Sequence, residues 1–498
     1  MVLTKLFVAN RIRMSQLFML LIAGLLGATV GRARAQDKGR LAMSDNPAPA
    51  VAERLALAAE AARRAPLPPA VRATVEALLI DVAGLCVAAR RSDYVRAALD
   101  GWEANGGSTA IGHARTLDAA GAAFVNGTAA HGEDFDDTFE GGPVHAGAVV
   151  VPAVLAAAER HRIAGPDALF GIAVGVEVMC RASLVAPKLI HKAGFHPTAV
   201  LGAMAAAAGV AAAGRAPRAA FVNALGIAGS MASGIIEYLA EGAWTKRLHP
   251  GWAAQSGIRA VELARSGFVG PRTVFEGTHG LYHGFARTSD GDWGKLLDAF
   301  GERWLGETVA FKQYACGTMT HPYIDCAKRL AARGIKPEDV VEIVCEAAEG
   351  TVHRLWEPLA AKQRPPNAYA AKFSQPYCIA AGFVLGHAGL DAFTEERVRD
   401  ERLRALAGKV KYVIDPDNPY PNEYTGHVRV RLKDGAVVEE RQPHLRGGAH
   451  EPLSRADIED KFRLNCAYGG WPAARAEQFL AFARRAFDAA VDLAPYRG

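Results

Sequence analysis

The segment from His131 to Thr138 is the feature that most restricts how this chain can fold. It contains four carboxylates within five residues, and His145 follows it closely. Stretches of small apolar residues with the composition of buried helices flank it, at 119–125 and 149–155. Because Asp and Glu are rarely buried unless they are paired or used, the cluster is either a solvated loop between helices or a polar pocket inside a helical interior.

A second segment favours the pocket. The sequence Gly-Phe-His-Pro-Thr at 194–198 precedes an alanine-rich stretch, 199–208, that is typical of a buried helix. Proline suits the first position of a helix, so His196 is predicted to lie at the helix N-terminus. The free N–H groups there attract carboxylates. A lone histidine at this position could simply cap the helix, but beside the acidic segment it becomes a candidate acid/base group.

Hydrophobic periodicity divides the chain into two regions of different secondary structure. From about residue 50 to 300 the pattern is helical and alanine-rich, and beyond Lys312 strands alternate with helices. A chain of 498 residues is too long for one core, so two domains are expected. The predicted helices are 70–87, 152–160, 168–184, 219–233, 324–333 and the tail 472–491, and the predicted strands are 340–345 and a hairpin of 427–432 with 437–438 around Asp434-Gly435.

Several ordered blocks of the sequence resemble the MmgE/PrpD family, which includes 2-methylcitrate dehydratase, cis-aconitate decarboxylase and iminodisuccinate epimerase. The resemblance runs from about residue 47 to the C-terminus. Each block alone is weak, but their joint order makes the match specific. The blocks are 126–138 with His145, 194–198, 245–251, 311–314 with 320–322, and 372–377.

The resemblance implies a mainly α fold, in which a large all-α helical domain carries a smaller α+β lid domain. It also implies a homodimer. The expected organisation is an N-terminal extension at 1–42, the all-helical domain at 43–307, the α+β lid domain at 308–470, and a C-terminal helix at 471–498 that returns to the helical domain.

By the same resemblance, active-site positions carry over residue by residue. The positions expected to be catalytic are Asp134, His145, His196, Lys246 and Lys312. The positions expected to bind substrate are Thr138, Arg247, His321 and Tyr377. No metal ligand and no cofactor are expected, and the implied ligand is a small anionic polycarboxylate.

These residue types fit the removal of a group from a polycarboxylate. Loss of water from a hydroxy-tricarboxylate needs a base for the proton next to a carboxylate and an acid for the departing hydroxyl. Histidines such as His145 and His196 titrate near neutrality in ordinary surroundings, and Asp134 can fix a tautomer or carry the proton itself. Lys246 and Lys312 can hold substrate carboxylates and stabilise enediolate-like charge, although a single lysine usually lies on the surface.

Three departures from the family's pattern bear on the substrate. The loop 139–144 adds Glu140 near the expected site. The bulky Trp252 follows a block near which the family usually has small residues. Residues 315–317 read Ala-Cys-Gly where decarboxylase-like relatives have a histidine, so that His321 is the nearest one. These differences weaken the assignment as a decarboxylase most.

We therefore expect a cofactor-independent lyase of the 2-methylcitrate dehydratase type. An epimerase or isomerase, or an activity like that of cis-aconitate decarboxylase, would use the same chemistry at the α-proton. A non-catalytic protein that binds an anionic metabolite is the alternative from another class. It is disfavoured because the acid/base residues are present beside the binding residues.

Composition excludes several other classes. The seven cysteines are scattered, odd in number and without a C-x-x-C pair, which argues against a disulfide framework, a zinc site or an iron–sulfur cluster and favours a reducing compartment. The net charge of +5 is modest and without basic runs, so nucleic acid is not an expected partner. Neither a P-loop nor a G-x-S-x-G motif occurs. Glu133, Asp134 and Asp137 could instead form a magnesium-binding motif, but no second acidic motif follows to complete it.

The N-terminus has the layout of a secretory signal. Basic residues precede the apolar stretch 17–26, and Ala33-Arg34-Ala35 follows it. The apolar stretch is too short for a comfortable membrane span. The alternative is that translation starts at Met43, which agrees with the unpaired cysteines. The expected location is therefore cytoplasmic, or exported if the segment 1–35 is a real signal.

Overall fold

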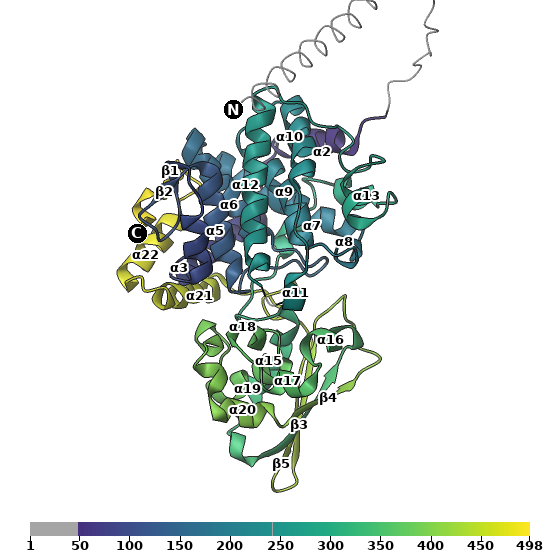
Figure 1. Ribbon diagram of the computed structural model, residues 1–498, viewed down its shortest axis with the longest axis vertical. Coiled ribbons are helices and arrows are strands. Elements are labelled where there is room, and N and C mark those ends of the chain that lie inside the picture. The colour runs from purple at the N-terminus through teal and green to yellow at the C-terminus, as the bar shows by residue number, and fades with distance from the viewer. Residues whose placement is uncertain (1–47, 242) are drawn as a thin grey trace, which may run out of the picture. The chain divides into compact units, whose positions relative to one another are not determined.

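The structure, a computed structural model, describes residues 48–241 and 243–498 (Figure 1). The signal-like segment 1–35 and the rest of the expected extension 1–42 lie outside the described residues. Residues 49–498 group together by their contacts, and one continuous hydrophobic core runs through them. The fold is mainly α with a small α+β portion, as the sequence predicts.

Helices make up the first part of the chain, where the sequence predicts them. α7, α9, α12, α5 and α6 pack against one another at its centre. The bounds are α2 (Val51–Ala62), α3 (Pro69–Ala89), α4 (Asp93–Asp100), α5 (Ala119–Gly132), α6 (Ala146–His161), α7 (Gly165–Val185), α8 (Leu189–Lys192), α9 (Pro197–Ala213), α10 (Arg218–Met231), α11 (Tyr238–Glu241), α12 (Thr245–Arg265), α13 (Leu281–Ala286) and α14 (Trp293–Leu297).

Small residues allow the central helices to approach closely. Where α5 crosses α12, a methyl group on Gly127 would lie 2.7 Å from the Cα of Gly251. Where α7 crosses α9, a methyl group on Gly171 would lie 2.6 Å from the carbonyl oxygen of Gly209. No larger side chain fits either crossing, so the glycines set the distance between the helices that carry the site.

α7 is, among the described residues, the one helix long and apolar enough to cross a membrane. Its most apolar stretch is 94% buried inside the protein, so it is a core helix. The first part also contains a small antiparallel pair of strands that the sequence pattern does not predict, β1 (Asn105–Thr109) and β2 (Thr116–Leu117). These strands are short and contain glycines, so they lack the alternation of apolar and polar residues by which a strand is predicted.

The later part of the chain mixes helices with a four-stranded sheet of order β4-β3-β5-β6. The predicted hairpin is present, since β5 and β6 pair antiparallel across the Asp434-Gly435 turn. β4 pairs with β3 in parallel and forms the opposite edge of the sheet from β6. The bounds are α15 (His321–Ala332), β3 (Val340–Ala347), α16 (Val352–Leu355), α17 (Leu359–Gln363), α18 (Ala368–Ala371), α19 (Gln375–Leu385), α20 (Glu401–Ala407), β4 (Val410–Ile414), β5 (Gly426–Leu432) and β6 (Val437–Gln442).

The end of the chain returns to the helical part. α21 (Arg455–Tyr468) and α22 (Ala473–Ala483), drawn in yellow in Figure 1, both pack on α3. The predicted helix over 472–491 is too long, because α22 ends at Ala483. The chain beyond it leaves the helix to pair with the start of α7, where the Gly165 N–H donates to the carbonyl of Ala489 at 2.6 Å.

Candidate active site

The acidic segment connects two buried helices. α5 is buried along its whole length and ends at Gly132, where a methyl group would collide with the ring of Tyr94. The chain then turns through Asp134, whose φ of 55° lies in the left-handed region. Aspartate adopts this conformation more readily than most residues. His145 stands immediately before the next helix, α6, and the aspartates between the two helices are buried, so the segment is a buried polar turn rather than a solvated loop.

Two lysines from distant parts of the chain hold Asp134. The Nζ of Lys246, in the first turn of α12, lies 3.0 Å from Asp134 Oδ1, and the Nζ of Lys312 lies 2.9 Å from the same oxygen. Burial opposes the charge of Asp134, but the two ammonium groups hold its pKa well below its usual range. Burial likewise opposes the charge of Lys246, and Asp134 nevertheless raises the pKa of that lysine. The three groups therefore form a charged cluster, called the Asp134 centre below, that is largely shielded from solvent.

Hydrogen bonds fix two histidines next to this centre. The Nδ1–H of His131, at the end of α5, donates to Asp136 Oδ2 at 2.7 Å, and the Nδ1–H of His145 donates to the carbonyl of Asp137 at 2.7 Å. In both rings the lone pair is therefore on Nε2. Burial lowers the pKa of both, that of His145 to about 3, so each ring is neutral at pH 7. Burial opposes the charge of Asp136, but the hydrogen bond from His131 and the ammonium group of Lys312, 4.0 Å away, help to hold its pKa below its usual range.

His196 lies at the N-terminus of α9, as predicted, with Pro197 in the first helical position. Its Nδ1 is 3.0 Å from Nδ1 of His249, on α12, so one of the two rings donates to the other. Burial lowers the pKa of both rings, that of His249 to about 4. The ring of Tyr238 packs edge-on against both histidines, with centroids 6.3 Å and 5.7 Å away.

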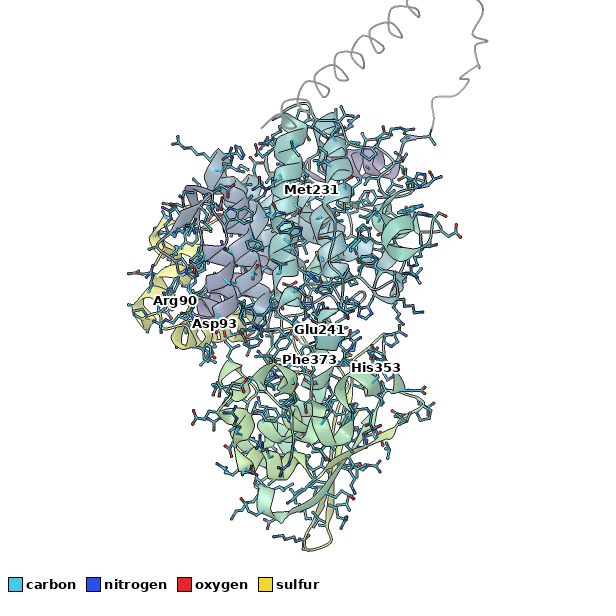
Figure 2. All side chains as sticks on the ribbon, viewed as in Figure 1. Arg90, Asp93, Met231, Glu241, His353 and Phe373 are labelled. Carbon is cyan, nitrogen blue, oxygen red and sulfur yellow. The ribbon has the colours of Figure 1, made fainter. Side chains whose placement is uncertain are left out.

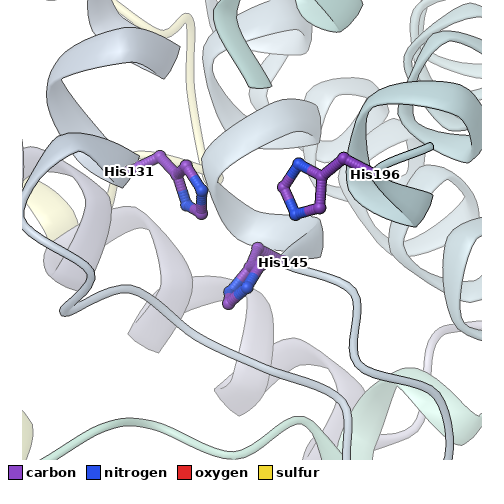
Figure 3. Close-up of side chains that lie close together, drawn as sticks. All are labelled: His131, His145 and His196. Carbon is purple, nitrogen blue, oxygen red and sulfur yellow. The ribbon is translucent and has the colours of Figure 1, made fainter. Parts of the chain in front are cut away.

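His131, His145 and His196 face one another from α5, the start of α6 and the start of α9 (Figure 3). Their nearest ring nitrogens all lie within 4.8 Å of one another, close enough to hold a transition metal if the rings moved inward. Burial lowers the pKa of His145 most, and nearby charges act in both directions, since Asp136 raises this pKa whereas Lys312 and Lys246 lower it. That these histidines hold no metal stays a prediction.

A second layer of charge surrounds the acidic segment. Lys372 Nζ lies 2.9 Å from Glu133 Oε2, and the Tyr94 hydroxyl donates to Glu133 Oε1 at 2.9 Å. The guanidinium of Arg247 stacks between the rings of Tyr94 and Tyr369, at 4.4 Å and 4.5 Å. Arg247, a predicted substrate-binding residue, therefore lies beside the Asp134 centre.

The α+β region supplies one wall of the site. Phe373, labelled in Figure 2, lies where the two regions meet, and the Nζ of Lys246 is 5.7 Å from the centre of its ring. Lys312 is 2% exposed and His145 is 9% exposed, so the site is closed over in this structure rather than an open cleft.

The structure brings the five predicted catalytic residues together, but not all four predicted substrate-binding residues. Thr138 belongs to the same segment, and its backbone forms a two-way bridge with Ala310. The hydroxyl of Tyr377 donates to the carbonyl of Ala392, and His321 packs against Tyr314. The hydrogen bonds that the structure describes for Tyr377 and His321 are made inside the α+β region, so a role for these two in binding substrate stays a prediction.

Sequence reasoning missed several residues of the site. His131 and Asp136 stand five apart, a spacing that gives no helical face, and they meet only because α5 ends between them. His249 could have been found, because it lies three residues after Lys246 and so shares its helix face. Tyr238 and Tyr369 carry no local signal.

Comparison with known proteins agrees with this architecture. A model of the MmgE/PrpD N-terminal domain matches residues 53–293, and a model of the MmgE/PrpD C-terminal domain matches residues 314–484. The chain belongs to the MmgE/PrpD family. Within it, Asp134, His145, His196 and Lys246 fall in the N-terminal match, whereas Lys312 lies between the two matches.

Relatives within the MmgE/PrpD family include cis-aconitate decarboxylases. The human cis-aconitate decarboxylase is 32% identical over 367 residues, which cover 70% of this chain and 72% of that protein. A cis-aconitate decarboxylase-like protein, oryM, of Aspergillus oryzae is 28% identical, over 75% of this chain and 80% of its own length. The cis-aconitate decarboxylase of Aspergillus terreus is 27% identical, over 74% of this chain and 79% of its own length.

Proposed function

We propose that this member of the family is a lyase that removes a group from a small polycarboxylate by acid/base chemistry. One observation carries the proposal. A carboxylate, that of Asp134, sits between the ammonium groups of Lys246 and Lys312, beside neutral histidines. A substrate carboxylate entering this centre would pair with one of the ammonium groups in place of Asp134 and lie next to the imidazoles.

The histidines supply the proton transfer. His145 presents an unprotonated Nε2, since its Nδ1–H is bound to the Asp137 carbonyl, and is therefore a base in the resting enzyme. His196 and His249 are both neutral in the resting enzyme. A bound polycarboxylate would raise the pKa of these rings, so that His196, hydrogen-bonded to His249, could then carry the proton that the acid delivers. In a dehydration, the base takes the proton next to a carboxylate, the carbon–oxygen bond breaks, and the acid protonates the departing hydroxyl.

The lysines supply the charge stabilisation. Removing a proton or CO₂ next to a carboxylate leaves an electron pair that spreads into that carboxylate as an enediolate-like dianion. Fixed ammonium groups in a buried site stabilise such charge more strongly than water does. Lys312 is buried, Lys246 is largely shielded from solvent, and both are already oriented by Asp134, so they need little reorganisation as the charge develops.

The identity of the leaving group is the finer part of the proposal. The names of the relatives favour loss of CO₂ from cis-aconitate, in which the carbon–carbon bond breaks, its electron pair enters the adjacent double bond system, and an acid protonates the far carbon. Loss of water from 2-methylcitrate, the reaction expected from the sequence, uses the same groups. It stays a candidate because Cys316 and its neighbours stand where decarboxylase-like relatives have a histidine.

A panel of substrates tests the proposal. Purified protein would be given cis-aconitate, 2-methylcitrate, citrate and iminodisuccinate, with products followed by NMR and CO₂ release measured separately. CO₂ from cis-aconitate would establish the decarboxylase, and an unsaturated product from 2-methylcitrate the dehydratase. Racemisation of iminodisuccinate would indicate the epimerase instead. Binding without turnover of any of the four would contradict a lyase and support a metabolite-binding protein.

A further inference from the structure

Three buried lysines from the second half of the chain reach three consecutive carbonyl groups of the acidic segment. Lys372 Nζ donates to the carbonyl of Glu133 at 2.6 Å, and Lys312 Nζ to that of Asp134 at 2.9 Å. Lys461 Nζ donates to the carbonyl of Phe135 at 2.7 Å. The three lysines lie before α15, between α18 and α19, and in α21, so three separate parts of the fold meet at one turn.

Each of these ammonium groups also has a carboxylate partner. Lys372 pairs with Glu133 and Lys312 with Asp134, both at 2.9 Å, while Lys461 pairs with Asp81 of α3 at 2.7 Å. A buried charge is tolerated only when it is paired and hydrogen-bonded. Because the pairing holds each ammonium in place, its second bond can direct a backbone carbonyl.

The acidic segment needs such partners. It follows directly on the C-terminus of α5, where carbonyl groups have no partner further along the helix and where the helix dipole favours cations. Asp134 adopts a left-handed conformation between Glu133 and Phe135, and the three carbonyls of this turn are bound from three different parts of the chain.

We infer that Lys372 and Lys461 are positioning residues, which hold the backbone of residues 133–137 so that Asp134 and Asp136 face Lys246 and His131. The inference rests on the proposed function, in which these carboxylates lie at the reacting centre. Lys312 both positions the backbone and pairs with the reacting centre, since it binds the carbonyl and the side chain of Asp134. Lys461 has no bond to the Asp134 side chain in the described structure, so its effect on the reaction passes through the backbone.

The decisive variant is the double substitution Asp81→Asn with Lys461→Met. Replacing Lys461 alone would leave Asp81 as an unpaired buried charge and could prevent folding. The double variant removes both charges and keeps both shapes, yet the Phe135 carbonyl still loses its donor. We expect kcat to fall at least tenfold and KM to change by less than about threefold, because a misplaced catalytic group can cost about 10²-fold in rate.

The matched control is the double substitution Glu177→Gln with Arg181→Met, which also removes a buried ion pair without leaving an unpaired charge. Arg181 is another fully buried cation, paired with Glu177 and bound to the carbonyl of Asp298 at 2.8 Å, but it makes no described contact with the acidic segment. Loss of this pair should lower the melting temperature without selectively lowering kcat. An equal fall in kcat in the control and the Asp81/Lys461 variant, or an unchanged kcat in the Asp81/Lys461 variant, would overturn the inference.

A second measurement does not depend on activity. Hydrogen exchange of the amides at 134–138, followed by mass spectrometry, should be faster in the Asp81/Lys461 variant and in Lys372→Met than in the wild type or the Glu177/Arg181 control. Unchanged exchange there overturns the positioning role whatever the substrate is. Faster exchange in a protein that turns over no substrate would instead separate a correct inference from a failed proposed function.

Discussion

At the scale of single residues, the tautomers of the histidines decide how the site works. His131 and His145 are held by oxygen acceptors at Nδ1, so their Nε2 atoms face the site without a proton. Among the described side chains, Nε2 of His131 has no hydrogen-bond partner. A buried atom of this kind is costly unless a ligand satisfies it, which agrees with a site that is complete only when substrate is bound.

His145→Asn should lower kcat by about 10²–10⁴-fold, the usual contribution of acid/base catalysis. KM should change little, since the amide nitrogen can take the place of Nδ1 and keep the bond to the Asp137 carbonyl. Steady-state kinetics at saturating substrate would show it. Full turnover of the variant at high substrate would mean that another residue is the base.

The two lysines at Asp134 should differ when replaced. Lys246→Met removes one charge-assisted contact, which typically contributes about 1.5–3 kcal/mol, so kcat/KM should fall roughly tenfold or more and high substrate should restore part of the rate. Lys312→Met also removes the bond to the Asp134 carbonyl, so its kcat should fall further. An equal fall in kcat in the two variants would count against a role for Lys312 in positioning the Asp134 backbone.

Asp137 should make the stability of the fold decrease as the pH rises. Burial, reinforced by Asp136, raises the pKa of Asp137 to about 8, so the folded protein keeps the proton that the unfolded chain loses near pH 4. The stability that Asp137 contributes is therefore complete below about pH 4 and declines as the pH rises towards 8.

Asp137→Asn should remove this decline while keeping the acceptor for the Gly147 N–H. Its free energy of unfolding, relative to the wild type, should improve by up to about 1.4 kcal/mol per pH unit between pH 5 and 8. Urea unfolding at several pH values measures this. A difference that stays constant with pH would show that Asp137 is ionised in the folded protein.

At the scale of elements, the crossing of α5 and α12 determines how far Lys246 lies from Asp134. Each helix presents a glycine there, and a methyl group on Gly251 would come within 2.1 Å of the Phe124 carbonyl. The helices themselves follow from the sequence, because long apolar stretches with turn residues at their ends have few alternatives. Their angle and spacing do not, since they depend on contacts between residues far apart in the chain.

Gly251→Ala should therefore push α12 away from α5. Overpacking of this kind typically costs about 1–3 kcal/mol, and the melting temperature should drop accordingly. Activity per folded molecule should fall as well, since Lys246 moves with its helix. Gly267→Ala, at an exposed turn with open space for a methyl group but a φ of 91°, is the comparison for strain alone. Loss of activity in both variants would show that stability, not helix spacing, is responsible.

At the scale of the whole molecule, the sequence predicts the helical and α+β regions and which residues meet at Asp134, whereas the supporting contacts emerge only from the fold. The convergence of Asp134, Lys246 and Lys312 could be expected because these positions match family blocks. Lys461 could not be expected, since it lies in no such block and meets Phe135 across 326 residues. The weak strands β1 and β2 were missed because pairing, rather than side-chain pattern, creates them.

Chelation tests the electrostatics of the whole site. The reaction should survive prolonged EDTA treatment, because the proposed steps use side chains alone and Lys246 and Lys312 supply the charge stabilisation. Activity measured before and after treatment, with metal content checked by mass spectrometry, is the appropriate test. Loss of activity that Zn²⁺ restores would show that the histidines of Figure 3 hold a metal in the working enzyme.

The contact between Lys461 and Phe135 also bears on when the protein can become active during its synthesis. The ribosome makes the acidic segment early, but the ammonium that binds its last carbonyl belongs to α21 and emerges much later. A nascent chain could bury most of its helices before then and still lack the finished turn. A message cut short after α20 would therefore yield a chain in which the Phe135 carbonyl lacks this donor and α3 lacks the helix that packs on it.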